Sequence, residues 1–120
     1  MKKNKERRTN PRVPMVVKVE DLQTGKKAQY YSREVSSGGL FLETNDVYSV
    51  GTPLQLSFEI PGSGHHVDVK SSVVHSQKVI EKGKNPGMGI RFEDIDSRSK
   101  KLLIEYVEKL EKIRKKLSDV

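Results

Sequence analysis

The chain has 120 residues, contains no cysteine and carries a formal net charge of +7 at pH 7. This length suits one domain that buries roughly two thirds of the surface its unfolded chain exposes, so a second domain is not expected. The lack of cysteine excludes disulfide bonds and thiolate metal sites. No apolar run approaches the roughly 20 residues of a membrane span, and the basic start has no signal-peptide core. We therefore expect a soluble cytoplasmic protein with no membrane insertion.

The positive charge lies at the two ends of the sequence. Residues 1–12 carry six basic and one acidic side chain, residues 13–96 carry nine and eleven, and residues 97–120 carry eight and four. A nucleic-acid-binding domain usually has a basic stripe on its folded surface. The mildly acidic middle does not favour that class, and the basic ends are either solvated surface or a means of capturing an anion.

The first basic segment contains Arg7, Arg8 and Arg12. Pro11 and Pro14 favour extended conformations for the residues before them, which predicts a loop. In an extended chain Arg8 and Arg12 can lie up to about 13 Å apart. Guanidinium groups bond bidentately to phosphates and to the O6 and N7 edge of guanine. The segment is too poor in apolar side chains to order alone, so we expect a mobile arm that captures a large anion.

A β-hairpin is predicted next, with strands over residues 15–20 and 28–33 and a glycine-bearing turn between them. The sequence Glu-Val-Ser-Ser-Gly-Gly then occupies residues 34–39. The Glu34 carboxylate can accept two N–H bonds from a guanine edge, and the Ser36 hydroxyl can donate or accept one. Gly38 and Gly39 allow a sharp turn and close backbone approach to a ligand. Alone, this pattern is more often an ordinary hairpin turn.

Four further strands are predicted over residues 40–43, 54–60, 67–74 and 88–92. The segment 54–60 alternates apolar and polar residues, which indicates one buried and one solvated face. The long segment 67–74 is interrupted by Ser71 and Ser72, where we expect a kink. Six antiparallel strands at short spacing favour a small barrel, because closure leaves no exposed edge.

The last segment is predicted to be a helix through about Leu117, with Asp96-Ser97 as the N-cap. Its apolar residues follow a heptad pattern, which comprises Leu103, Tyr106, Leu110, Ile113 and Leu117. Over the first two turns, three further apolar residues widen this row: Leu102, Ile104 and Val107. We expect the widened part to pack on the barrel. The narrower end either lies on the same barrel or forms a homo-oligomer.

Catalytic and metal-binding chemistry finds little support. His65, His66 and His75 are the histidines of the chain, and adjacent histidines in an extended loop point to opposite sides. Ser36 lacks the strand-to-helix turn of a hydrolase nucleophile, and no phosphate-binding glycine motif is present. We therefore expect no enzyme, no metal site and no cofactor.

Two segments together resemble the PilZ domain family, whose members are bacterial receptors for cyclic di-GMP. Residues 8–12 match the family pattern R-x-x-x-R, and residues 34–39 match [D/N]-x-S-x-x-G except that Glu34 replaces the shorter acid or amide. Residues 51–56 and 87–92 also look like strands of this family. The resemblance implies a mainly β fold, a six-stranded antiparallel barrel with a C-terminal helix, divided into an arm at 1–12, a barrel at 13–96 and a helix at 97–120.

The resemblance also implies a function and a site. Cyclic di-GMP would be bound by Arg7, Arg8, Arg12, Glu34, Ser36 and Gly39. An arginine just before the R-x-x-x-R pattern accompanies a stacked nucleotide pair in the family, so Arg7 predicts two ligands per chain. The receptor would pass the bound state to a downstream protein. The alternatives are a degenerate adaptor that binds protein but no nucleotide, favoured by Glu34, and a basic nucleic-acid-binding protein.

Overall fold

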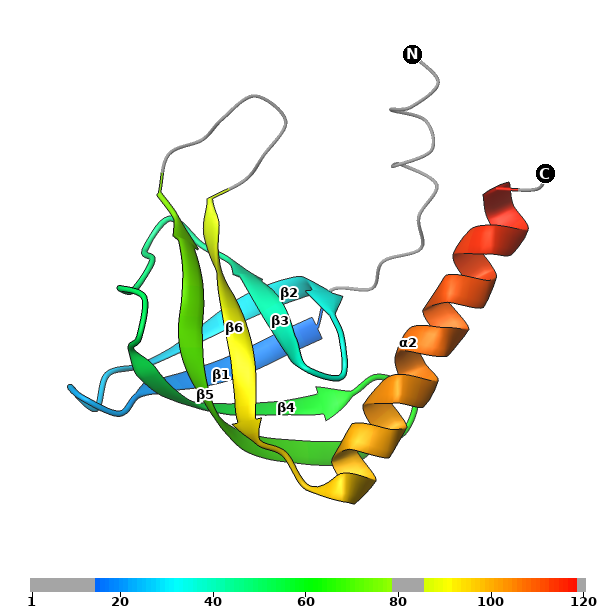
Figure 1. The fold of residues 1–120 in the computed structure, drawn as a ribbon, viewed down its shortest axis with the longest axis horizontal. Coiled ribbons are helices and arrows are strands. Elements are labelled where there is room, and N and C mark those ends of the chain that lie inside the picture. The colour runs from blue at the N-terminus through cyan, green and yellow to red at the C-terminus, as the bar shows by residue number, and fades with distance from the viewer. Residues whose placement is uncertain (1–14, 79–85, 119–120) are drawn as a thin grey trace, which may run out of the picture.

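The computed structural model describes residues 15–78 and 86–118, and these form six strands and one helix (Figure 1). The bounds are β1 Met15–Asp21, β2 Lys27–Val35, β3 Gly39–Glu43, β4 Pro53–Ile60, β5 His65–Gln77, β6 Gly87–Asp94 and α2 Ser97–Ser118. All six predicted strands and the predicted helix are confirmed. The expected arm at residues 1–12 lies outside the described residues.

The strands close into an antiparallel barrel in the order β1-β2-β3-β6-β5-β4, which confirms the predicted fold. Alternate residues of each strand fill its interior, because successive side chains point to opposite faces. In β4 these are Leu54, Leu56, Phe58 and Ile60, each at most 3% exposed. Apolar side chains from β1, β3, β4, β5 and β6 thus form one continuous core, and Tyr30 and Val35 of β2 pack against it.

The long strand β5 pairs with two neighbours along different parts of its length. Residues 65–72 pair with β4, and residues 70–77 pair with β6. The pairing with β6 shifts register between Lys70 and Ser71 and again between Val73 and His75. Such irregularities bend a strand and increase its twist. The kink predicted near Ser71 therefore lies where the barrel turns from one neighbour to the other.

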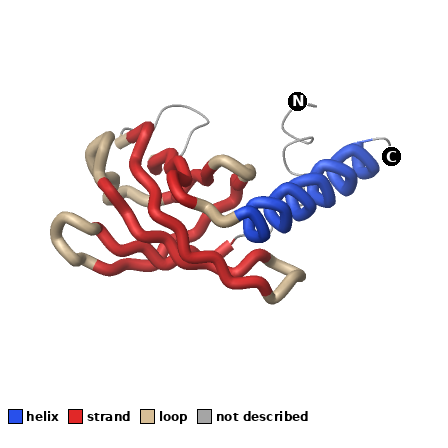
Figure 2. Tube along the Cα trace, turned by 60° about the horizontal axis from the view of Figure 1, so that its bottom comes forward, coloured by secondary structure: helices blue, strands red, loops and turns tan. Residues whose placement is uncertain are grey.

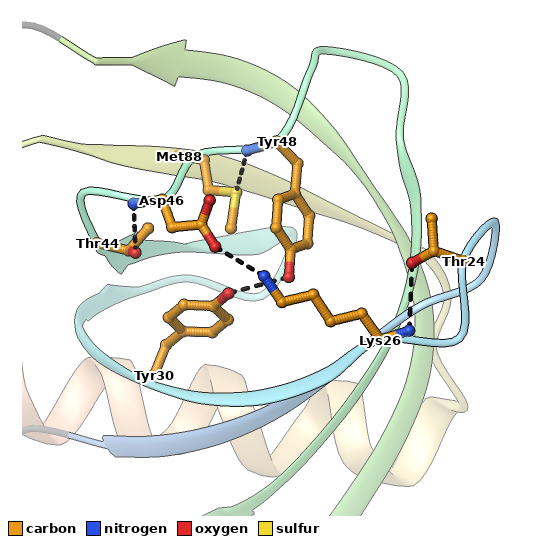
Figure 3. Close-up of polar contacts among 7 residues, drawn as sticks. All are labelled: Thr24, Lys26, Tyr30, Thr44, Asp46, Tyr48 and Met88. Atoms are coloured by element: carbon orange, nitrogen blue, oxygen red, sulfur yellow. Dashed lines mark hydrogen bonds and ion pairs between the residues drawn. The ribbon is translucent and has the colours of Figure 1, made fainter.

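A tyrosine pair ties the segment after β3 to the barrel (Figure 3). The hydroxyl groups of Tyr30 and Tyr48 lie 3.0 Å apart, and the Tyr48 N–H donates to the Met88 sulfur at 3.4 Å. Lys26 forms an ion pair with Asp46 and lies 5.9 Å from the Tyr48 ring centre. Burial, followed by the hydrogen bond between the Tyr30 and Tyr48 hydroxyl groups, raises the pKa of Tyr30. Tyr30 of β2 and Met88 of β6 thereby hold the segment that follows β3. This segment lies at the opposite end of β3 from the β2–β3 turn.

The helix α2 begins at a capped turn and packs through its first half. The Ser99 N–H donates to Asp96 Oδ1 and the Ser99 hydroxyl to Oδ2, both at 2.8 Å. Both bonds lower the pKa of Asp96, and the bond from the Ser99 N–H has the larger effect. Leu103 is fully buried, with Leu102 and Tyr106 against the core. Ile104 is 39% exposed and Val107 is not among the side chains packed on the core, so the expectation that these two pack on the barrel is wrong.

The second half of α2 runs clear of the strands in two views (Figures 1 and 2). No helix among the described residues combines the length and the apolarity needed to cross a membrane.

Candidate functional site

Three of the predicted site residues, Glu34, Ser36 and Gly39, lie in or beside the turn between β2 and β3. The strand β2 extends to Val35, so Glu34 lies in a strand and the turn itself is limited to residues 36–38. This corrects the expectation of a turn across all of residues 34–39. The shorter turn holds its flanking residues on two paired strands, which is a more rigid support than a loop.

The Ser36 hydroxyl is already engaged within this turn. The Ser36 N–H donates to the Gly39 carbonyl at 2.8 Å, and its hydroxyl donates to the same oxygen at 3.3 Å. The Gly38 N–H in turn donates to the Ser36 hydroxyl at 3.2 Å. A hydroxyl has one donor and two acceptor positions, so one acceptor position remains for a ligand. Ser36 therefore first shapes the turn and then offers an acceptor.

A β-bulge places Glu34 on the outer face of the barrel. The pairing of β2 with β3 shifts between Ser32 and Glu34, so that Ser32 lies opposite Leu42 and Glu34 lies opposite Phe41. Ser32 is buried, whereas Glu34 is exposed. In an unbroken strand residues two apart would share one face. The extra residue at the bulge thus turns the Glu34 carboxylate from the core side to the solvent side.

Gly39 is required by the packing of β3 on β6. A Cβ atom at this position would lie 2.0 Å from the Ile90 carbonyl oxygen, far inside van der Waals contact. Gly38 is less confined, since its Cβ would meet only the Ser36 hydroxyl at 4.0 Å. The Phe92 N–H also donates to the Gly38 carbonyl at 2.9 Å. Gly39 therefore allows the β6 backbone to approach β3 closely. From the sequence pattern alone, we expected this glycine to allow the close approach of a ligand.

These residues surround an open groove of about 350 Å³ on the outer face, lined by Glu34, Val35, Ser36, Gly39, Leu40 and Phe41. The residues of the groove include a carboxylate at Glu34 and a hydroxyl at Ser36. Carboxylate and hydroxyl oxygens accept hydrogen bonds. The groove therefore has the chemistry to hold the donor edge of a heterocycle.

One cation next to this groove was not predicted from the sequence. Arg91 on β6 is the Cα partner of Gly39 and is exposed on the outer face. Alternation with the buried Ile90 and Phe92 indicates from the sequence that Arg91 points outward. Its position across from Gly39 depends on the pairing of β3 with β6, which joins segments about fifty residues apart.

The three predicted arginines, Arg7, Arg8 and Arg12, lie outside the described residues. The structure nevertheless describes where the strand that follows them begins. Met15, the first residue of β1, is the Cα partner of Ser32, two residues before Glu34. The Arg12 Cα atom can be at most about 11 Å from that of Met15, because three residues span no more than this distance. The arginine segment therefore joins the barrel close to the end of β2 that carries Glu34.

A second polar cluster lies on the outer face of β4 and β5. His66 Nε2 lies 2.9 Å from the Ser57 hydroxyl and 3.3 Å from Asp68 Oδ1. In a serine hydrolase the carboxylate holds the opposite ring nitrogen from the one that faces the serine. Here one nitrogen contacts both groups, so this cluster is not arranged as a catalytic triad. No group of three or more metal-ligating side chains occurs within residues 15–78 and 86–118.

The sequence matches one family model over most of its length. The family model described as PilZ domain matches residues 6–109. No curated protein has a significant sequence match.

Three solved structures are similar in fold. The PilZ domain with c-di-GMP of YcgR from Escherichia coli is 18% identical, with a TM-score of 0.62 and 88% of each chain covered. The Bacillus subtilis inhibitor of motility MotI/DgrA is 17% identical, with a TM-score of 0.67, and the match covers 78% of this chain and 45% of that one. The chain thus spans less than half the length of MotI/DgrA. The PilZ domain of CeSA from a cellulose-synthesizing bacterium is 14% identical, with a TM-score of 0.56 over 82% of this chain and 94% of that one.

Proposed function

Because the chain belongs to the PilZ domain family, we propose that it is a receptor for cyclic di-GMP that signals to a partner protein. The observation that carries this proposal is the outer-face groove at the β2–β3 turn, where Glu34, Ser36 and Gly39 come together. The chain enters the barrel beside this groove directly after the arginine segment. The solved complex of the YcgR domain with c-di-GMP supports the same ligand class.

In this proposal the carboxylate and the arginines divide the ligand between them. Glu34 accepts N–H bonds from a guanine edge, and the remaining acceptor position of Ser36 takes another. Arg8 and Arg12 bond to the phosphates and to the O6 and N7 edge of guanine. Arg7 adds a third guanidinium, which fits two stacked ligands because four phosphates brought close together need extra cations.

Arg91 is a further cation for this ligand. It lies opposite Gly39 on the outer face, so its guanidinium is tethered within reach of the groove by a paired strand. A bond from a guanidinium to a phosphate is charge-assisted and contributes about 1.5–3 kcal/mol. We expect Arg91→Ala to weaken nucleotide binding about tenfold or more, and Arg91→Lys to weaken it less.

Titration calorimetry with cyclic di-GMP tests the proposal, with cyclic di-AMP as the matched ligand that lacks the guanine edge. We expect Arg8→Ala and Arg12→Ala each to weaken binding about ten- to a hundredfold, the effect of losing one charge-assisted bond. Arg98→Ala is the control, because Arg98 is exposed on α2 and absent from the groove. Equal heats for both nucleotides, or unchanged affinity in either arginine variant, would refute the site.

The second candidate is an adaptor that binds protein and no nucleotide. Glu34 favours it, because its side chain is one methylene longer than the family's aspartate and would shift the contact with guanine. The fold shared with an inhibitor of motility is compatible with such a role. Absence of any heat with cyclic di-GMP would support this candidate. A steep salt dependence of binding to DNA or RNA would instead indicate the third alternative, a nucleic-acid-binding protein.

A further inference from the structure

The helix α2 has two halves with different surroundings. Ser99 and Leu103 are buried and Leu102 and Tyr106 pack against the core, whereas none of residues 107–116 belongs to the core or to the side chains packed on it. We call residues 107–116 the distal segment. Figures 1 and 2 show this end of α2 running away from the strands. At 1.5 Å per residue the distal segment adds about 15 Å of helix beyond the core contact.

The apolar row that packs on the barrel continues along the distal segment. Leu103 and Leu110 occupy the a positions of a heptad, and Tyr106 and Ile113 occupy the d positions. Ile113 is 46% exposed, although it continues the row of the fully buried Leu103. From Leu110 onward the row is limited to a and d positions, because Val107 at an e position is the last residue that widens it. Such a row is the narrow seam of a coiled coil, whereas a helix lying on a membrane surface has a wider apolar face. The seam therefore fits one other helix.

Basic side chains flank this seam. Lys109 and Lys116 occupy the g positions and Arg114 occupies the e position of the same heptads. Residues 107–116 include five basic and two acidic side chains. One of the acidic residues, Glu111, already forms an ion pair with Arg114. This pair offsets part of the charge of Arg114, but Lys109 and Lys116 leave the edges of the seam positively charged, and charges at these positions select the partner of a coiled coil.

This charge pattern decides between occupants. In a parallel pair of two copies, Lys109 of one helix would face Arg114 of the other, and antiparallel pairs would also bring basic flanks together. Residues 1–12 carry six basic and one acidic side chain, so the arm of the same chain meets the same repulsion. A helix with acidic flanks meets neither penalty.

We propose that the distal segment of α2 is a docking surface for an amphipathic helix of another protein, one with apolar a and d residues and Asp or Glu at its e and g positions. The surface lies on α2 and goes beyond the nucleotide-binding proposal, since it does not depend on cyclic di-GMP. The docked helix would continue the existing contact of Tyr106 with the barrel core, so both would bury one continuous seam.

The test uses the full chain without nucleotide and two synthetic helical peptides with leucine at a and d, one with glutamate and one with lysine at e and g. By fluorescence anisotropy we expect the acidic peptide to bind at least about tenfold more tightly. Lys109→Glu with Arg114→Glu should reverse this preference, and Ile113→Ser should weaken both peptides. The control Lys112→Glu with Lys115→Glu changes the same number of charges on the far side of the helix and should alter the affinity less than about twofold.

Three outcomes would overturn the proposal. The first is equal affinity for the two peptides, or a loss of affinity for the acidic peptide in Lys112→Glu with Lys115→Glu that equals the loss in Lys109→Glu with Arg114→Glu. Either result indicates nonspecific charge attraction. The second is a concentration-dependent dimer in sedimentation that Ile113→Ser dissociates, which assigns the seam to a second copy. The third is tighter binding to vesicles containing anionic lipid than to the acidic peptide, which assigns it to a membrane surface.

Discussion

The two glycines of the β2–β3 turn have different surroundings and therefore different tolerance to substitution. A Cβ at Gly39 would overlap the Ile90 carbonyl, whereas one at Gly38 finds open space out to 4.0 Å. The oxygen belongs to the backbone of a paired strand, so it cannot move aside as the end of a long side chain can. The absence of a Cβ atom at Gly39 is therefore required by the strand pairing as well as by the proposed site.

Gly39→Ala should therefore lower the free energy of unfolding by about 1–3 kcal/mol or more, the usual cost of forcing a carbon into a packed interior. Gly38→Ala is the matched control and should change it by less than about 1 kcal/mol. Urea denaturation followed by circular dichroism measures both. Equal midpoints for the two variants would contradict the close approach of β3 to β6.

Glu34 provides a second prediction at the residue scale. If its carboxylate bonds to guanine, Glu34→Asp should bind cyclic di-GMP as well or better, and Glu34→Ala should lose about 1.5–3 kcal/mol of binding free energy. Calorimetric titration of the three proteins measures the difference. Indistinguishable affinities would move specificity to the arginines and Ser36, and would favour the adaptor alternative.

Among the secondary-structure elements, α2 depends most visibly on a single side chain at its start. Asp96 caps the helix by accepting from the N–H and the hydroxyl of Ser99, and the Ser99 hydroxyl also lies 2.9 Å from His65 Nε2 on β5. The cap therefore fixes the direction in which the helix leaves the barrel. Because the distal segment belongs to the same helix, its placement depends on the same contacts.

The cap makes a pH-dependent contribution to stability. The hydrogen bond from the Ser99 N–H is the largest of the effects that lower the pKa of Asp96 below its ordinary value of 3.8. A lowered pKa in the folded state stabilises the protein fully above the unfolded value and loses this effect as the pH falls through the folded one. Asp96→Asn keeps an acceptor and should lose stability less steeply than the wild type below about pH 4. Parallel acid-unfolding curves for the two proteins would contradict this assignment.

For the whole molecule, the proposed ligand joins the arginine segment to the barrel. Residues 1–12 carry three arginines of the proposed site, and β1 joins this segment to the strand pair beside Glu34. A ligand that contacts both parts links them, and its binding free energy adds to the stability of the folded chain. In the proposed receptor, this coupling would provide the signal that a partner protein recognises.

We expect two cyclic di-GMP molecules per chain and slower proteolysis within residues 1–12 at saturating nucleotide. At a ligand concentration 100 times the dissociation constant, one bound ligand stabilises the folded state by about 2.7 kcal/mol. Calorimetry gives the stoichiometry, and timed trypsin digestion with mass spectrometry gives the protection. One ligand per chain, or equal cleavage rates with and without nucleotide, would refute the paired-ligand assignment.

Local patterns in the sequence were sufficient to predict the strands, the helix and the barrel fold. The alternation of Leu54, Leu56, Phe58 and Ile60 predicts a half-buried strand, because side chains on a strand alternate between two faces. The change to a heptad pattern after Asp96 predicts the helix for the same kind of reason. Both motifs of the proposed site are contiguous segments, so the sequence also supplied most of the candidate residues.

The tertiary structure decided what depends on pairing between distant segments. The bulge that turns Glu34 outward is defined by the register of β2 against β3, and the position of Arg91 beside Gly39 by the register of β3 against β6. Whether Ile104 is covered depends on where the barrel lies along the helix, which no helical period specifies. The sequence by itself determined which segments form strands and helix and which residues carry the chemistry. Only the closed barrel determined which of these residues face one another, because register is a property of two strands and not of one.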